Sequence, residues 1–136
     1  MPKSIPLPDR TSAFFWSAAS ESRLAVQRCN RCGAWHHPPV IACPQCQSED
    51  VRPTDVSGRG TVYSFTVVRQ AFDPAYAEEL PYLVALVELE EDPSLRLLSN
   101  LVKLEVPDAA VGMPVEVVFV ERNGQSLPMF RPRNDP

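Results

Sequence analysis

The segment that decides the fold of this 136-residue chain contains Cys29-Asn30-Arg31-Cys32 and, ten residues further on, Cys43-Pro44-Gln45-Cys46. Two intervening residues allow one tight turn to place both sulfurs of a pair at corners of a tetrahedron, with metal–sulfur bonds of about 2.3 Å. Thiols are kept reduced in the cytoplasm, so two tight pairs indicate metal ligands rather than disulfides. The spacing therefore predicts a metal ribbon in which one structural zinc ion binds Cys29, Cys32, Cys43 and Cys46.

The neighbours of the two pairs bear on the choice of metal. Gly33 follows the first pair and permits the backbone conformation with which such a turn ends, whereas Gln47 follows the second. Four thiolates also bind iron, so a rubredoxin-like electron carrier is an alternative, but a closed four-cysteine site favours structural zinc. His36 and His37 lie between the pairs; since four thiolates saturate the metal, we interpret both as loop or packing residues.

Charge and hydropathy exclude several classes of protein. Net charge is −4, and residues 51–136 carry thirteen acidic and eight basic groups. This balance argues against a nucleic-acid surface, which needs clustered positive charge to neutralise phosphates. The first eight residues contain no apolar run like that of a secretory signal, and no stretch of about 18 apolar residues suits a membrane span. We expect a cytoplasmic protein without membrane segments.

A short helix is expected over residues 11–21, with the hydroxyl of Thr11 or Ser12 capping its first turn. Three consecutive aromatic residues open it: Phe14, Phe15 and Trp16. At about 100° per residue they cover more of the circumference than one packing face needs. The helix is either buried against its own domain or clamped between this domain and a second protein chain, and we favour the second interpretation.

Strand-like patterns follow the cysteine section. They cover residues 61–69, 82–90, 95–104, 115–121 and 127–131. Asp92-Pro93-Ser94 suits a hairpin turn, and residues 107–112 read as one helical turn that Asp108 caps and Gly112 ends. The overall prediction is a mostly β protein: an N-terminal helix and zinc ribbon over residues 1–50, then a five-stranded OB-fold barrel over residues 51–136. A generic β-sandwich is the alternative.

The connection from Gln70 to Pro81 is long for a loop without regular structure, which favours a function for it. It carries Phe72 and Tyr76, so we expect an ordered loop that makes contacts. No nucleophile elbow, phosphate-binding glycine loop or metalloprotease helix is present. The densest acidic cluster, residues 90–92, falls at the predicted hairpin and is interpreted as a solvated turn. The sequence thus predicts no catalytic residues.

The chain resembles the DUF35 family over roughly residues 15–132. The resemblance rests on the order and spacing of short motifs: Arg28-Cys29-Asn30-Arg31-Cys32-Gly33, Pro39, Cys43-Pro44-Gln45-Cys46, Ser57-Gly58-Arg59-Gly60-Thr61-Val62-Tyr63-Ser64-Phe65-Thr66, Leu80-Pro81-Tyr82, Ser99-Asn100-Leu101-Val102, Gly112-Met113-Pro114-Val115 and Pro128-Met129-Phe130-Arg131-Pro132. Gln47 departs from the glycine usual in the family but leaves all four ligands in place.

The resemblance implies an acyl-CoA-associated accessory subunit that works, as a hetero-oligomer, with a thiolase-like enzyme or a lipid-transfer-type aldolase. The partner would hold the catalytic residues. Docking would then use the aromatic helix and the long loop, through Phe14, Phe15, Trp16, Phe72 and Tyr76. If CoA or acyl-CoA also binds this chain, the candidate phosphate contacts are Arg59, Arg69, Arg131 and Arg133. A single-stranded nucleic-acid-binding OB protein is the alternative, and the acidity of residues 51–136 counts against it.

Overall fold

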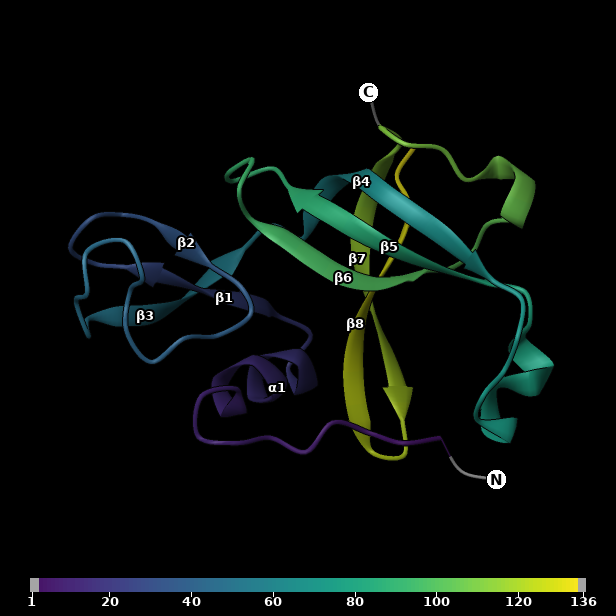
Figure 1. Ribbon diagram of the computed structural model, residues 1–136, viewed down its shortest axis with the longest axis horizontal. Coiled ribbons are helices and arrows are strands. Elements are labelled where there is room, and N and C mark those ends of the chain that lie inside the picture. The colour runs from purple at the N-terminus through teal and green to yellow at the C-terminus, as the bar shows by residue number, and fades with distance from the viewer. Residues whose placement is uncertain (1–2, 135–136) are drawn as a thin grey trace.

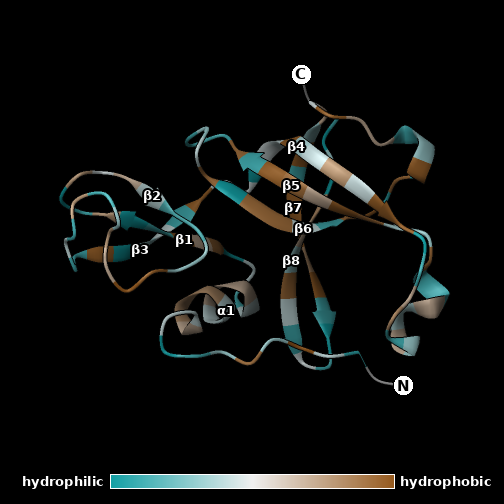
Figure 2. Ribbon diagram, in the orientation of Figure 1, coloured by the Kyte–Doolittle hydropathy of each residue, from teal (hydrophilic) through white to brown (hydrophobic). Residues whose placement is uncertain are grey.

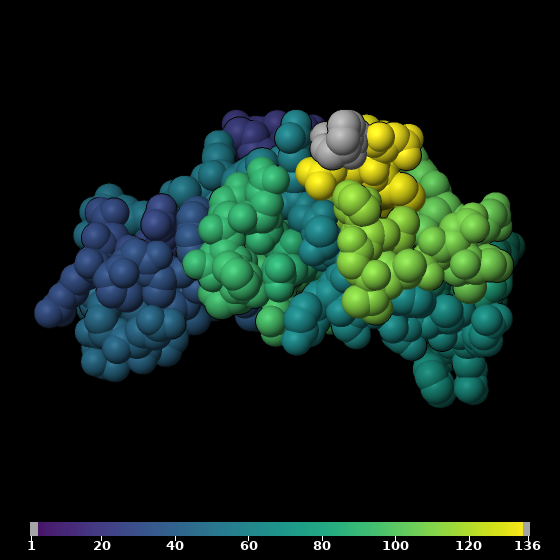
Figure 3. Space-filling model, turned by 90° about the horizontal axis from the view of Figure 1, so that it is seen from above, coloured from purple at the N-terminus to yellow at the C-terminus, as the bar shows by residue number. Residues whose placement is uncertain are grey.

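The computed structural model describes residues 3–134 and shows a helix, a small sheet and a closed barrel in that order along the chain (Figure 1). The helix α1, Ala13–Ser20, lies beside both the small sheet and the barrel. The fold class predicted from the sequence is confirmed. In the space-filling view the small sheet and its loops form a separate lobe beside the barrel (Figure 3). Among residues 3–134, no helix is long and apolar enough to cross a membrane.

The small sheet has three antiparallel strands in the order β2-β1-β3. They are β1, Leu24–Cys29; β2, Trp35–His36; and β3, Val51–Val56. The sequence pattern placed no strand before residue 61, and this was wrong. Residues 24–27 are all buried, because Leu24 and Val26 pack in the core with helix and barrel residues while Gln27 is bonded to the loop at Val40, so no alternating pattern marks the strand. The domain boundary at residue 50 stays a prediction.

The barrel contains five strands in the order β4-β5-β6-β8-β7. They are β4, Arg59–Val68; β5, Tyr82–Leu89; β6, Arg96–Leu101; β7, Pro114–Arg122; and β8, Gln125–Pro132. All five predicted strands are present, and β5 alternates strictly between buried and partly buried residues. Hydrophobic residues gather along β5 and β6, whereas the turn between β7 and β8 is hydrophilic (Figure 2).

Two predicted caps differ from the structure. The Ser12 hydroxyl accepts from the Asp9 amide instead of capping α1, while the Asp9 carboxylate accepts from the amides of Thr11 and Ser12. The first turn is thus organised by a carboxylate upstream of the predicted cap. After β6 the chain forms only a 3₁₀ turn, η2, Val106–Asp108, which Asp108 ends rather than caps. Gly112 adopts a left-handed φ of +89° beyond it.

The connection between β4 and β5 is ordered, as predicted. It forms a 3₁₀ helix, η1, Pro74–Glu79, whose first turn is capped by the Asp73 carboxylate accepting from the Ala75 amide at 3.0 Å. The N-terminal segment reaches this element, because the Lys3 ammonium lies 2.7 Å from the Glu79 carboxylate. Residues 3–12 thus run past the β7–β8 turn from η1 to α1 (Figure 1).

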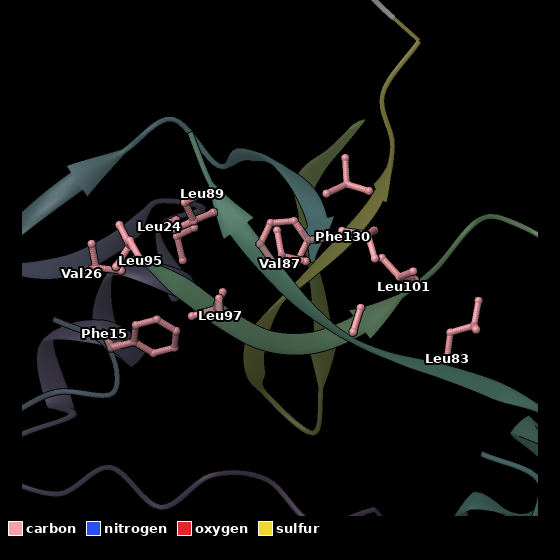
Figure 4. Close-up of a cluster of buried hydrophobic side chains, with 13 residues drawn as sticks. Phe15, Leu24, Val26, Leu83, Val87, Leu89, Leu95, Leu97, Leu101 and Phe130 are labelled. Atoms are coloured by element: carbon pink, nitrogen blue, oxygen red, sulfur yellow. The ribbon is translucent and has the colours of Figure 1, made fainter. Parts of the chain in front are cut away.

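One hydrophobic core joins the helix, the small sheet and the barrel. Phe15 of α1 and Leu24 and Val26 of β1 are buried beside Leu95 and Leu97 at the β5–β6 hairpin (Figure 4). At about 25 cal/mol per Å² of buried apolar surface, a continuous core of this kind resists separation of the two parts. The ribbon and barrel therefore pack as one unit.

The acidic turn between β5 and β6 also joins the two parts, contrary to its interpretation as a solvated turn. Glu91 is partly buried, and its carboxylate accepts from the Ser57 amide at 2.8 Å, in the link between β3 and β4. The Glu90 amide donates to the Arg59 carbonyl at 3.0 Å. The hairpin thus holds the connection between ribbon and barrel at a fixed place.

His37 packs the loop after β2 against α1, where its ring centroid lies 5.1 Å from that of Phe15. Burial lowers the pKa of His37 to about 4, so the side chain is neutral in the folded protein at pH 7. An exposed histidine in the unfolded chain titrates near pH 6.5, so the unfolded chain takes up the proton first as pH falls. Stability contributed by neutral His37 is complete above about pH 6.5 and is lost progressively down to about pH 4.

We therefore expect His37→Phe to remove part of the acid sensitivity of folding. Between pH 7 and 5.5 the free energy of unfolding of the unmodified chain should fall by about 1 kcal/mol more than that of the variant, measured by urea denaturation. His36→Phe is unsuitable as a control because His36 contacts a cysteine. Parallel pH dependence in the two proteins would contradict the buried, neutral state of His37.

Candidate functional site

The four cysteine sulfurs converge at the exposed end of the small lobe, all within 4.8 Å of one another. The sulfurs of Cys29 and Cys46 lie 3.6 Å apart, as do those of Cys32 and Cys43. Bonds of about 2.3 Å in a tetrahedron require sulfur separations of about 3.8 Å, so this cluster fits one zinc ion. The predicted ligand set is brought together in full, and no fifth ligand is needed to close it.

Both cysteine turns end in a left-handed residue. Gly33 has φ +80°, and its amide donates to the Cys29 carbonyl at 2.9 Å. Gln47 has φ +63°, and its amide donates to the Cys43 carbonyl at 2.7 Å. The second turn therefore keeps its shape without glycine, at a cost in backbone strain of about 1 kcal/mol.

A backbone amide favours the thiolate form of Cys29, whereas burial and the neighbouring cysteine sulfurs raise the pKa of the Cys32 thiol to about 11. The Cys32 amide donates to the Cys29 sulfur at 3.5 Å, and this bond lowers the pKa of the Cys29 thiol to about 6. The His36 ring nitrogen lies 3.2 Å from the Cys43 sulfur. His36 is thus buried against the cluster on β2, a contact that its interpretation as a loop or packing residue did not foresee. Its position next to a ligand sulfur is the outer-sphere role that orients metal ligands.

Gln27 fixes the loop that leads to the second cysteine pair. Its side-chain amide donates to the Val40 carbonyl at 3.0 Å, and its carbonyl accepts from the Val40 amide. Gln27 is buried on β1, one residue away from Arg28, whose guanidinium donates to the Gly33 carbonyl at 3.1 Å. These side-chain hydrogen bonds fix the loops of a lobe that has few strands to pair.

The predicted docking aromatics differ in exposure. Phe15 is buried in the core, so its ring is not part of the surface, contrary to the predicted role. Phe14 and Trp16 are partly buried and pack on the core, with the Trp16 ring edge-on to Phe15 at 4.8 Å. Tyr76 packs near Tyr82, with centroids 6.3 Å apart, and its hydroxyl accepts from Arg122. Phe72 is 89% exposed.

Three of the four predicted arginines converge on a cavity of about 700 Å³ at the end of β8. It is lined by Arg59, Arg131 and Arg133, with Glu116 lying 3.3 Å from the Arg131 guanidinium. Arg69 is absent from it, because a ten-residue strand of roughly 30 Å separates residue 69 from residue 59. Lys103 also lines the cavity and was missed, since an isolated lysine in a predicted strand carries no sequence signal.

Comparison with protein families places both parts of the chain. Residues 16–52 match the rubredoxin-like zinc ribbon domain of ChsH2, and residues 53–120 match the C-terminal OB-fold domain of ChsH2. The chain belongs to the ChsH2 (DUF35) family. The family's zinc ribbon coincides with the cysteine cluster, which supports structural zinc at these four sulfurs.

Individual relatives differ in how much of their length this chain matches. It is 41% identical over 96% of its length to a probable enoyl-CoA hydratase alpha subunit of Thermomonospora curvata, and 32% identical over 82% to a DUF35 domain-containing scaffold protein of Pyrococcus furiosus. It covers 41% of the first and 79% of the second. The chain thus spans about two fifths of the length of the hydratase alpha subunits that it matches.

A solved structure described as the Ltp2-ChsH2(DUF35) aldolase contains a chain of the same fold. The likeness has a TM-score of 0.85 at 41% identity, and covers 94% of this chain and 98% of that one. The resemblance recognised from motif order is therefore confirmed at the level of family and fold.

Replacing Cys46 by serine should abolish zinc retention, because a hydroxyl does not replace a thiolate ligand at a four-sulfur site. Structural zinc supplies about 10–16 kcal/mol of folding free energy in isolated finger peptides. Since the strands of the closed barrel pair with one another and not with the small sheet, the loss should be confined to residues 24–56. Elemental analysis for zinc, with amide hydrogen exchange to map the opened region, tests both expectations.

Gln47→Gly serves as the matched control. It changes the same turn but removes only left-handed strain, so it should retain one zinc per chain and release it to a chelator no faster than the unmodified protein. Zinc retained by Cys46→Ser with unchanged exchange in the ribbon would show that Cys46 is not a ligand.

Proposed function

We propose that this family member is a non-catalytic, zinc-containing accessory subunit of a thiolase-like or aldolase complex that acts on acyl-CoA thioesters in the cytoplasm. The observation that carries the proposal is the match of 94% of this chain to 98% of a chain in the structure described as the Ltp2-ChsH2(DUF35) aldolase. The naming of a related protein as a scaffold supports the same role. The hydratase names belong to proteins of which this chain covers about two fifths, and they carry less weight here.

The cysteines and histidines of this chain, which are common nucleophiles and general bases, are held in structural contacts. All four cysteines lie in the metal cluster. Of the two histidines, His36 contacts the Cys43 sulfur and His37 is held under Phe15 with a pKa lowered by burial to about 4. Since catalysis needs such groups near the reacting atoms, we expect the isolated chain to turn over no acyl-CoA.

Docking to the thiolase-like partner would use Trp16 on α1 and Phe72 beside η1. The helix α1 and the η1 connection lie on either side of the β7–β8 turn, and residues 3–12 run between them (Figure 1). Leu7 in this segment is 87% exposed. A standard protein–protein interface buries about 800 Å² on each partner. A surface that includes α1, this segment and the loop would be long enough to supply that area.

Phe72→Ala should weaken the complex at least tenfold without changing the thermal midpoint, because an exposed aromatic anchors interfaces but contributes nothing to the core. Trp16→Ala should weaken it similarly while also lowering the midpoint, since Trp16 packs on Phe15. The measurement is co-purification with a thiolase-like protein of the same organism, followed by titration calorimetry.

Val111→Ala is the control, because it removes an apolar side chain that is 67% exposed outside the proposed surface. Equal affinity of Phe72→Ala, Trp16→Ala and the control, or recovery of no partner, would exclude this docking surface.

CoA phosphates would occupy the cavity lined by Arg59, Lys103, Arg131 and Arg133. Guanidinium groups bind phosphate through paired hydrogen bonds, and the cavity gathers cations on a barrel whose total charge is negative. The same acidity argues against single-stranded nucleic acid, which would need a cationic path along many nucleotides.

Arg59→Ala and Arg131→Ala should each lower affinity for CoA about tenfold, as expected when one charge-assisted hydrogen bond is lost. Arg69→Ala is the matched control, because it removes the same charge far from the cavity and should leave affinity unchanged. The affinity of each variant is measured by titration with CoA and with CoA lacking the ribose 3′-phosphate. Equal losses from all three variants would indicate only a general effect of net charge.

A further inference from the structure

The cationic cavity is one of three hollows that share lining residues. A hollow of about 390 Å³ lies between α1, the His37–Pro39 loop, β6 and β8, and is lined largely by apolar side chains including Phe15 and Leu98. A second hollow of about 540 Å³ adjoins it and shares Asn100, Arg122 and Met129 with it. The second hollow in turn shares Lys103 with the cationic cavity. We call this series of three adjoining hollows the path; its lining is apolar near α1 and cationic beyond Lys103.

The path follows a split between two barrel strands. Within residues 3–134, β6 pairs with β8 only at Leu101 opposite Phe130, where the Val102 amide donates to the Phe130 carbonyl at 2.8 Å. Upstream, the strands are bridged by a side chain, because the Ser99 hydroxyl donates to the Pro128 carbonyl at 2.6 Å. Pro128 has no amide hydrogen to offer β6. Along the first part of β6 the closed barrel therefore has no ladder pairing with β8, and we call this unpaired stretch the split.

The split leaves main-chain groups of β6 without a strand partner. Because these groups alternate in direction along a strand, those of Leu98 face the same side as those of Val102, toward β8 and the split. The Leu98 side chain is 69% exposed and lines the apolar hollow. A ligand entering the split therefore meets a strand edge that offers an amide and a carbonyl.

We infer that the pantetheine arm of an acyl-CoA lies in the split between β6 and β8, with its amide groups paired to the main chain of Leu98. The nucleotide phosphates reach the cavity beyond Lys103, and the acyl end points to the apolar hollow beneath α1. The inference rests on the proposed acyl-CoA role and adds the path and direction of the ligand. From residue 127 to residue 131, β8 spans about 13 Å, a length suited to an extended arm.

The proposed orientation of the ligand connects the CoA site with the docking surface. An acyl thioester delivered beneath α1 emerges beside Trp16, a residue proposed for docking, so the reacting carbonyl would face the partner's active site. A free peptide from the partner is the competing occupant of an unpaired strand edge. The cations at one end of the path and the apolar lining at the other favour an anionic ligand with an apolar tail.

Leu98→Pro tests the main-chain contact directly. Proline removes the amide hydrogen that faces the split, and since this hydrogen does not pair with β5, the barrel should fold. Leu98→Ala is the matched control, because it shortens the side chain and keeps the amide. Affinity for CoA and for pantetheine should fall about three- to tenfold in Leu98→Pro relative to Leu98→Ala, the loss of about one hydrogen bond.

A second pair of variants covers the case in which Leu98→Pro does not fold. Met129→Trp fills the junction of the first two hollows and should weaken CoA and pantetheine, whereas Met129→Leu should not. With ¹⁵N-labelled protein, pantetheine should shift the amides of Leu98 and Asn100, and only CoA should also shift Lys103 and Arg131.

The outcomes separate this inference from the proposed function. Equal affinity of the proline and alanine variants, shifts confined to the cationic cavity, or no CoA binding by the chain would overturn the inference. Partner binding is measured independently with Phe72→Ala. If the docking proposal fails, the CoA titrations still test the inference. A partner-derived peptide that shifts Leu98 while pantetheine does not would assign the split to the peptide instead.

Discussion

The convergence of four cysteine sulfurs within 4.8 Å is the constraint on which the N-terminal part of this family member depends. The lobe has three short strands, one of them only two residues long, and its loops carry exposed side chains such as Ile41. So small a sheet buries little apolar surface of its own, and small domains of this kind need a metal or a neighbouring core to fold. Here both are present, since β1 also packs on α1 and on the β5–β6 hairpin.

The sequence predicted best where a physical pattern was local. The alternation of β5, the turn at residues 92–94 and the spacing of the cysteine pairs each follow from a few adjacent residues. β1 was missed because it is buried on both faces and shows no alternation. β3 was missed because Arg52, Pro53 and Asp55 interrupt an edge strand with residues that strands usually exclude.

For the candidate surfaces too, the sequence predicted what depends on residue type and missed what depends on packing between distant segments. Arginines were chosen as phosphate contacts from residue type alone, and three of the four meet in one cavity because β4 and β8 place their ends together. Lys103 joins them through a loop whose course no sequence pattern reveals. Aromatic residues on a helix were assigned to a partner, but Phe15 fills the space between ribbon and barrel, which only the three-dimensional packing shows.

The contact between Glu91 and Ser57 has a consequence for how this protein tolerates change in length. The β5–β6 turn acts as a spacer that sets the angle between the lobe holding the cysteines and the barrel face that carries the split. Inserting or deleting one residue at 90–94 would move the carboxylate off the Ser57 amide and rotate one lobe against the other. The η1 connection contacts the N-terminal segment through Lys3 and the barrel through Arg122, and the turn after β6 hydrogen-bonds to β4 at Val62. Extra residues at these two places should therefore leave the angle between the lobes unchanged.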